Sequence, residues 1–93
     1  MEIKHSVDGN KGRFYMEDDK GTAAEMTYSK AGDDRFIIDH TEVDDRFRGQ
    51  SLGLKLVEAA VGYARKNKMK IMPLCPFAKK MFERHSEYND VLW

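Results

Sequence analysis

The sequence predicts an α+β fold, in which a mostly antiparallel sheet of about five strands carries two helices. Two observations predict it. Short alternating apolar runs separated by glycine- and aspartate-rich turns fill residues 1–45, and a helical period replaces them from residue 52. Of the 93 residues, 41% are hydrophobic and 34% are charged, which suffices for one modest core. We therefore expect one domain over residues 1–93.

The first half of the chain is predicted to form four strands joined by short turns. Glycines and aspartates separate the apolar runs, and connections this short favour an antiparallel meander. The expected strands are Glu2–Val7, Arg13–Glu17, Thr22–Ser29 and Arg35–Val43, and the first hairpin loop is expected over Asp8–Gly12, with two glycines. The aspartate pairs at 18–19, 33–34 and 44–45 are expected to be solvated turn residues, not metal ligands.

The second half predicts two helices around one short strand. Its most regular feature is an apolar stripe at helical spacing, formed by Leu52, Leu56, Val57, Ala60 and Ala64. This stripe indicates an amphipathic helix of about four turns. A fifth strand is expected over Lys70–Met72 and should end at Pro73, while Pro76 suits the first turn of the second helix.

Composition and charge narrow the class of protein. The chain has one cysteine, no apolar run of the roughly 20 residues that a membrane span needs, and no apolar core of a signal peptide at its start, so we expect a cytoplasmic protein without a membrane partner. Residues 1–45 hold 6 Lys/Arg against 12 Asp/Glu, and residues 46–93 hold 10 against 4. The basic half favours an anionic ligand, unless the two halves simply neutralise each other.

The segment Arg46–Leu54, RFRGQSLGL, lies where the last strand of the meander gives way to the first helix. The first N–H groups of a helix have no intrahelical partner, and the helix dipole makes that end partly positive. Gly49 and Gly53 leave room for a ligand, and Ser51 and two arginines add a hydroxyl and charge. Two interpretations are open: a cradle for a phosphate, or a turn shaped by glycines with Ser51 as a helix cap.

Three segments together resemble the GNAT acetyltransferase superfamily. Residues Arg48–Gly53 follow its acetyl-CoA pyrophosphate loop, with pattern Arg/Gln-x-x-Gly-x-Gly/Ala, except that Ser51 stands where the family usually has glycine. His40–Val43 before the loop and Pro73–Phe77 after it extend the resemblance over nearly the whole chain, towards small single-domain GNAT-like N-acetyltransferases of the YjdJ type. The resemblance implies a truncated GNAT-like fold that binds coenzyme A.

The resemblance also implies which residues contact acetyl-CoA, used as a cosubstrate. The expected contacts are Thr41, Glu42 and Val43 on the fourth strand, Arg48, Gly49, Gln50, Ser51, Leu52, Gly53 and Leu54 in the loop, and Cys75 and Phe77 beyond the fifth strand. Lys79, Lys80 and Arg84 are expected either at the nucleotide end of coenzyme A or in solvent. We expect no metal, because the histidines and Cys75 lack zinc-like spacing.

His40 and Glu42 are candidate catalytic residues. Strand alternation predicts that Ile38, His40 and Glu42 share one face. Histidine exchanges protons near neutral pH, so His40 could act as the base that deprotonates an amine, with Glu42 orienting it or serving as base itself. The alternative is that His40 is a partly buried histidine bonded to a neighbour.

Cys75 is the third candidate catalytic residue. It precedes Pro76, which places it at a helix N-terminus, where the dipole favours a thiolate. The resemblance implies a nucleophile that would accept the acetyl group and hand it on. Two alternatives stay open: direct transfer, as in most GNAT enzymes, and a small buried apolar side chain.

We therefore expect an acetyl-CoA-binding N-acetyltransferase, with an amine acceptor and an oligomeric state that the sequence does not indicate. One alternative is a non-catalytic coenzyme A-binding module. A less favoured alternative is a nucleic-acid-binding domain that uses the basic second half with Phe77 and Phe82, whose affinity would fall steeply with salt.

Overall fold

The computed structural model describes residues 1–93 and has a five-stranded sheet in the order β1-β2-β3-β4-β5. The strands are β1 (Lys4–Asp8), β2 (Lys11–Asp18), β3 (Gly21–Lys30), β4 (Arg35–Val43) and β5 (Lys70–Pro73). The first four form an antiparallel meander, and β5 pairs parallel to β4. The predicted α+β class and sheet are confirmed.

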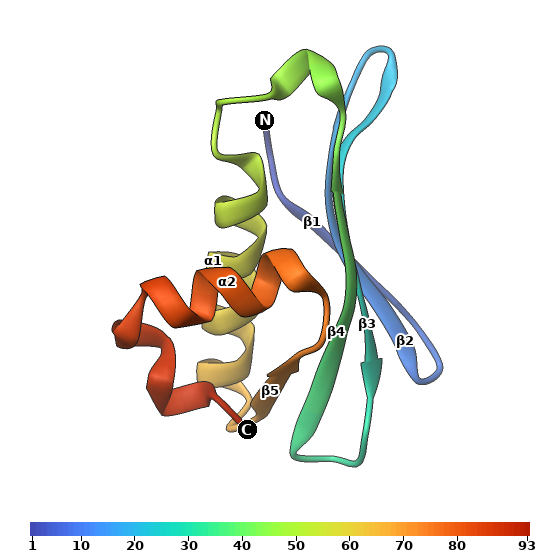
Figure 1. Cartoon of the computed structure of the whole chain (residues 1–93). Helices are drawn as coiled ribbons and strands as arrows, with labels where there is room; N and C mark the ends of the chain where they lie inside the picture. Colours follow the sequence, from blue (N-terminus) through green and yellow to red (C-terminus); the bar gives the residue numbers. More distant parts are fainter.

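Two helices, α1 (Leu52–Lys66) and α2 (Pro76–Arg84), lie together on one side of the sheet (Figure 1). Two short 3₁₀ segments, η1 (Asp45–Phe47) and η2 (Ser86–Val91), were not predicted. The segment η1 follows β4 and leads into the loop before α1. The segment η2 follows α2 and brings the chain back towards β5 (Figure 1).

The core lies between the sheet and α1, because the apolar stripe of α1 faces the inner side of the strands. Its fully buried members include Met16, Met26, Tyr28, Phe36, Ile38, Leu56, Val57, Ala60 and Ala64. The outer face of the sheet has no such cover. No polar or charged residue is fully buried.

The β1–β2 hairpin is tighter than predicted. Only Gly9 and Asn10 form the turn, and Gly12 lies within β2. A Cβ at Gly12 would lie 2.2 Å from the ring of Tyr28 on β3, so this glycine makes room for the ring and does not shape the loop.

A β-bulge in β4 changes which side chains face the helices. Thr27 pairs with His40, whereas the next residue of β3 pairs with Ile38, so Asp39 is the extra residue. Ile38 is buried against the helices, but His40 and Glu42 are exposed on the outer face. The predicted common face of these three residues is therefore wrong, and the bulge is the reason.

Candidate functional site

The loop before α1 holds an unusual backbone conformation at two positions. Gly49 has φ of +85° and Ser51 has φ of +61°, both in the left-handed region. Ser51 occupies the N-cap position of α1, yet its hydroxyl makes no capping hydrogen bond. The interpretation of Ser51 as a side-chain cap is therefore wrong, and the helix start keeps its donors free.

Four consecutive backbone N–H groups at this helix start, those of Ser51, Leu52, Gly53 and Leu54, donate to no other group of the protein. The first paired donor is the N–H of Lys55, which binds the Ser51 carbonyl at 3.1 Å. Free donors at the positive end of a 15-residue helix form a site suited to an anion.

A groove of about 420 Å³ runs beside this helix start. Eight of the twelve predicted cofactor-binding residues line it: Val43, Arg48, Gly49, Ser51, Leu52, Gly53, Leu54 and Phe77. The other four, Thr41, Glu42, Gln50 and Cys75, do not line it. Arg84, expected either at the nucleotide end of coenzyme A or in solvent, lines it, and so do Phe47, Met81 and His85, which were not predicted to. Phe47 belongs to η1, which no pattern in the sequence indicated.

The arginines expected to add charge to the loop are both paired. Arg46 binds Asp18 at 2.9 Å and Asp44 at 3.1 Å. Its hydrogen bond lowers the pKa of Asp18 below its ordinary value, and the Arg46 backbone N–H followed by its side chain does the same to the pKa of Asp44. Arg48 lies 2.8 Å from Asp45, with both side chains largely exposed. Arg46 therefore ties η1 to the end of β2, so Asp18 and Asp44 are not merely solvated.

Gly53 lies directly against Phe77 of α2. A Cβ at Gly53 would lie 2.5, 2.8 and 3.3 Å from three carbons of the Phe77 ring. The glycine therefore allows the ring to pack on the start of α1, where it forms part of the groove wall.

Cys75 is the N-cap of α2, and Pro76 is the first helical residue, as predicted. Its Sγ accepts the N–H of Ala78 at 3.3 Å and lies 3.3 Å from Thr41 Oγ1, and the residue is only 6% exposed. The backbone N–H groups of Leu74 and Cys75 both donate to the Ile38 carbonyl at 3.2 Å. The thiol is thus held against β4 just beyond its pairing with β5.

His40 and Glu42 form a separate pair on the other face of β4. Their side chains lie 3.4 Å apart and are 61% and 75% exposed. Thr41, between them in sequence, contacts Cys75 on the helix side. The structure therefore brings Thr41 to Cys75 and His40 to Glu42, but it does not bring His40 to Cys75.

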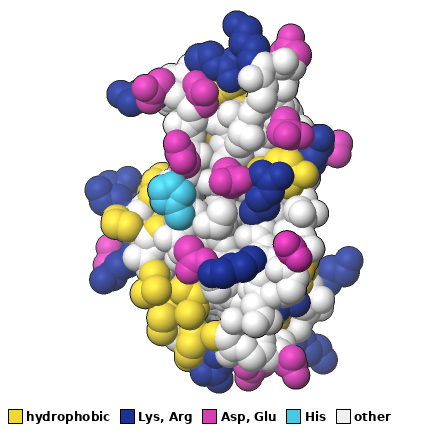
Figure 2. Space-filling model, turned by 90° about the vertical axis from the view of Figure 1, so that its right-hand side faces the viewer, with side chains coloured by type: hydrophobic (Ala, Val, Ile, Leu, Met, Phe, Trp, Pro, Cys, Tyr) yellow, Lys and Arg dark blue, Asp and Glu magenta, His cyan; other side chains and the backbone are white.

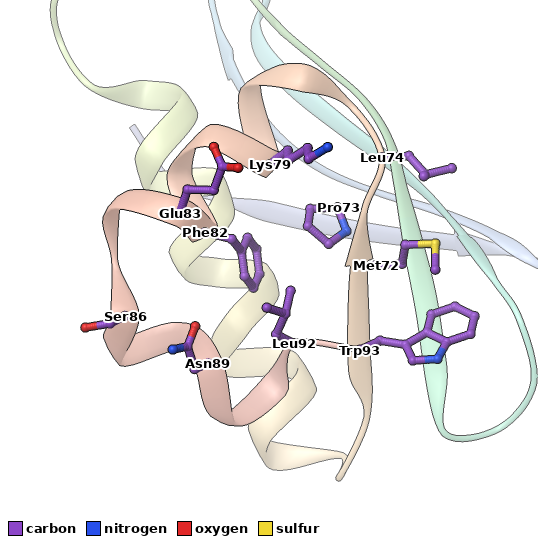
Figure 3. Close-up of a pocket in the computed structure, with 10 residues that line it drawn as sticks. All are labelled: Met72, Pro73, Leu74, Lys79, Phe82, Glu83, Ser86, Asn89, Leu92 and Trp93. Carbon is purple, nitrogen blue, oxygen red and sulfur yellow. The ribbon is translucent and has the colours of Figure 1, made fainter.

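A second cavity, of about 550 Å³, lies on a different face of α2, between that helix, β5 and η2 (Figure 3). Its apolar lining includes Phe82, Leu92 and Trp93, and Lys79 is among its polar residues. None of the three candidate catalytic residues and none of the twelve expected acetyl-CoA contacts lines it. Lys79, expected at the nucleotide end of coenzyme A or in solvent, lies at this cavity instead of at the groove beside α1.

The outer face of the sheet mixes charges of both signs (Figure 2). Lys, Arg, Asp and Glu side chains alternate over it, so this face carries no continuous basic surface of the kind that tracks a nucleic-acid backbone. No helix in the structure combines the length and apolar character that crossing a bilayer requires.

A strand, a loop with free amide donors and a helix in this order match the class of acetyl-CoA-dependent transferases that the loop resembles. The family model described as GCN5-related N-acetyl-transferase matches residues 13–91, and the chain belongs to this family. A solution structure of a GCN5-like candidate N-acetyltransferase from Staphylococcus aureus is 42% identical, with a TM-score of 0.78, over 99% of this chain and 87% of that chain. A search of curated proteins found no match.

Larger acetyltransferases share the fold. The ribosomal-protein-S18-alanine N-acetyltransferase from Escherichia coli is 17% identical with a TM-score of 0.68, over 84% of this chain and 53% of that chain. A candidate streptothricin acetyltransferase from Bacillus anthracis, solved with acetyl coenzyme A, is 20% identical with a TM-score of 0.61, over 81% of this chain and 46% of that chain. The present chain thus spans about half the length of these two proteins.

Proposed function

We propose that the protein binds acetyl-CoA in the groove beside α1 and transfers its acetyl group to an amine. Membership of the GCN5-related family supports acyl transfer from acetyl-CoA. The free N–H groups of Ser51–Leu54 are the observation that carries the cofactor assignment, because a pyrophosphate needs several converging donors. When bound, acetyl-CoA supplies the acetyl group as a thioester.

The chain offers separate contacts for the two parts of this cosubstrate. In the proposal, the loop from Arg48 to Leu54, including Gln50, holds the pyrophosphate, and the backbone of Thr41–Val43 holds the pantetheine. Phe77 and Val43 supply apolar walls of the groove. Fixed backbone N–H groups near the reacting carbonyl would stabilise the negative charge that develops on its oxygen.

Cys75 is the proposed nucleophile of a two-step route. Its sulfur already accepts a hydrogen bond at the N-terminus of α2, an environment that stabilises negative charge on sulfur. The sulfur would attack the acetyl carbon, the bond from that carbon to the coenzyme A sulfur would break, and coenzyme A would leave as its thiol. An amine would then attack the acetyl group on Cys75 and restore the cysteine.

His40 and Glu42 are proposed to act on the amine rather than on Cys75. They lie on the outer face of β4, opposite the side where Thr41 contacts Cys75. A base there would deprotonate an amine that approaches over the open face and then reaches the acetyl group past the edge of β4 beyond Ile38, where the pairing with β5 ends. Acetyl-CoA would in this way reach β4 from the helix side, and the amine would reach it from the outer face.

Incubation with acetyl-CoA, followed by intact-mass measurement and peptide mapping, tests the route. The proposal predicts one acetyl group on Cys75, lost when an accepted amine is added, and no adduct in Cys75→Ser. Release of coenzyme A thiol with full activity in Cys75→Ser would show direct transfer instead, and would contradict the role of Cys75.

A non-catalytic coenzyme A-binding module is the second candidate function. It is favoured by the open outer face of β4, where the side chains of His40 and Glu42 are mostly exposed and no element covers them. This function predicts coenzyme A binding without thiol release across a broad panel of amines.

A further inference from the structure

The C-terminal end of α2 presents a cation to the groove that no acidic side chain neutralises. Arg84 lines the groove, and its side chain makes no ion pair with the protein. The arginines on the loop side, Arg46 and Arg48, are paired with aspartates. His85, the next residue, lies 3.4 Å from Glu87. Arg84 is therefore the uncommitted positive charge of the groove.

The position of Arg84 follows from the periodicity of α2. Phe77, Met81 and Arg84 are four and three residues apart, so they share one face of the helix, and all three line the groove. Lys79 belongs to another face and lines the second cavity instead (Figure 3). Lys80 lines neither cavity. Of the three basic residues of α2, only Arg84 faces the groove.

The helix also separates Arg84 from the thiol. Cys75 caps the N-terminus of α2 and Arg84 is its last residue, so nine residues at about 1.5 Å each place them roughly 13 Å apart along the axis. The free N–H groups of Ser51–Leu54 belong to a different element of the groove. If a ligand places its acyl end near Cys75 and its pyrophosphate at the loop, then Arg84 stays available to bind another group of the same ligand, beyond the pyrophosphate.

We propose that Arg84 binds the phosphate on the ribose of coenzyme A, the 3′-phosphate, and so distinguishes coenzyme A from 3′-dephospho-coenzyme A. This assignment rests on the proposed function. Coenzyme A carries its 3′-phosphate apart from the pyrophosphate, and the loop already offers four free N–H donors to the latter. A guanidinium matches a phosphate with paired N–H donors, whereas an ammonium is only a point charge.

Calorimetric titration of the full chain with coenzyme A and with 3′-dephospho-coenzyme A tests this. The wild-type protein should bind coenzyme A about five- to tenfold more tightly than the dephospho form. Arg84→Gln should lower the affinity for coenzyme A by the same factor and leave the affinity for the dephospho form unchanged. Arg84 is exposed, so the variant should keep the wild-type melting temperature.

Lys80→Gln is the matched control, because it removes one positive charge from the same helix without touching the groove. It should change neither affinity by more than about twofold. If Arg84→Gln loses affinity equally for both ligands, or loses affinity for neither, the assignment is overturned while the proposed function stays intact. Failure of the wild-type protein to bind either ligand would overturn the proposed function itself, and the assignment with it.

Discussion

Ser51 has a left-handed backbone that a side chain normally makes costly. Its φ of +61° costs a residue with a Cβ about 1 kcal/mol relative to glycine. With this conformation, the N–H groups of Ser51–Leu54 at the start of α1 donate to no loop carbonyl. Ser51 therefore maintains the free donors at some cost in backbone strain. Glycine would adopt the same conformation without this cost, so it suits this position.

Substitutions at Ser51 should separate backbone strain from side-chain chemistry. Ser51→Gly should bind coenzyme A as tightly as the wild-type protein or more tightly, because relief of strain leaves the donors in place. Ser51→Val should lower the free energy of unfolding by about 1–2 kcal/mol and weaken binding, since β-branched residues avoid this region. Urea unfolding and coenzyme A titration measure the two effects. Marked loss of binding in Ser51→Gly would contradict the role of the loop.

His5 is the side chain that anchors the exposed strand β1 to the core. Its ring stacks on Phe14 at 4.2 Å and meets Tyr63 of α1 edge-on at 4.7 Å. With Nε2 unprotonated, the Tyr28 hydroxyl donates to it at 2.6 Å. Partial burial, followed by the charge of Lys30, lowers the pKa of His5, and burial raises the pKa of Tyr28 to about 12. The neutral imidazole is therefore the form that the fold prefers.

The stability of the protein should fall as the pH drops below the ordinary pKa of histidine, about 6.5. Below that value the unfolded chain binds a proton at residue 5 more readily than the folded chain does, and the loss stops once the pH passes the lower folded pKa. Urea unfolding at pH 7.5 and 5.5 measures this slope. It should be smaller in His5→Gln than in the exposed control His40→Gln. Equal slopes in both variants would contradict the role of His5.

At the scale of elements, the contact between α1 and α2 depends on a missing side chain. The Phe77 ring occupies the space that a Cβ of Gly53 would take. The same ring lines the groove, so the packing of the two helices and the shape of the cofactor site are coupled at this point.

Gly53→Ala should therefore affect binding more than stability. Better helix propensity, worth about 1 kcal/mol, offsets much of the overpacking cost of about 1–3 kcal/mol. The displaced Phe77 ring should narrow the groove and weaken coenzyme A binding about tenfold. Gly62→Ala, in the same helix with nothing within 4 Å of its Cβ, should stabilise the protein by about 0.5–1 kcal/mol and leave binding unchanged. Equal affinities in the two variants would contradict the coupling.

The pattern of elements was predictable, because it depends on local periodicity and turn chemistry. The apolar stripe of α1 and Pro76 at the start of α2 are local signals, and both helices lie where these signals place them. The bulge at Asp39 was not predictable, because the alternation of Ile38, His40 and Glu42 in the sequence suits an unbroken strand. Only the pairing with β3 shows the extra residue.

The candidate site shows the same division between local and long-range information. The loop composition indicated the helix start, and the free N–H groups of Ser51–Leu54 are there. The pairing of Arg46 with Asp18 joins residues 28 positions apart, and Phe77 fills the space beside Gly53 from another helix. Such contacts depend on tertiary packing, which no local pattern encodes. The sequence did not distinguish Arg84 from the other two basic residues of α2, and only the structure shows that Arg84 alone of the three lines the groove.

In the whole molecule, the proposed function depends on the start of α1, which is proposed to hold the pyrophosphate of acetyl-CoA. The most direct measurement is a titration of the ¹⁵N-labelled protein with acetyl-CoA, followed by the shift of each backbone amide signal. Binding should be saturable, with smaller shifts along the groove face of α2 and the largest shifts at Ser51, Leu52, Gly53 and Leu54. Saturable shifts centred instead on Met72–Leu74 and Leu92–Trp93, around the second cavity, or no shifts at millimolar acetyl-CoA, would contradict this proposal.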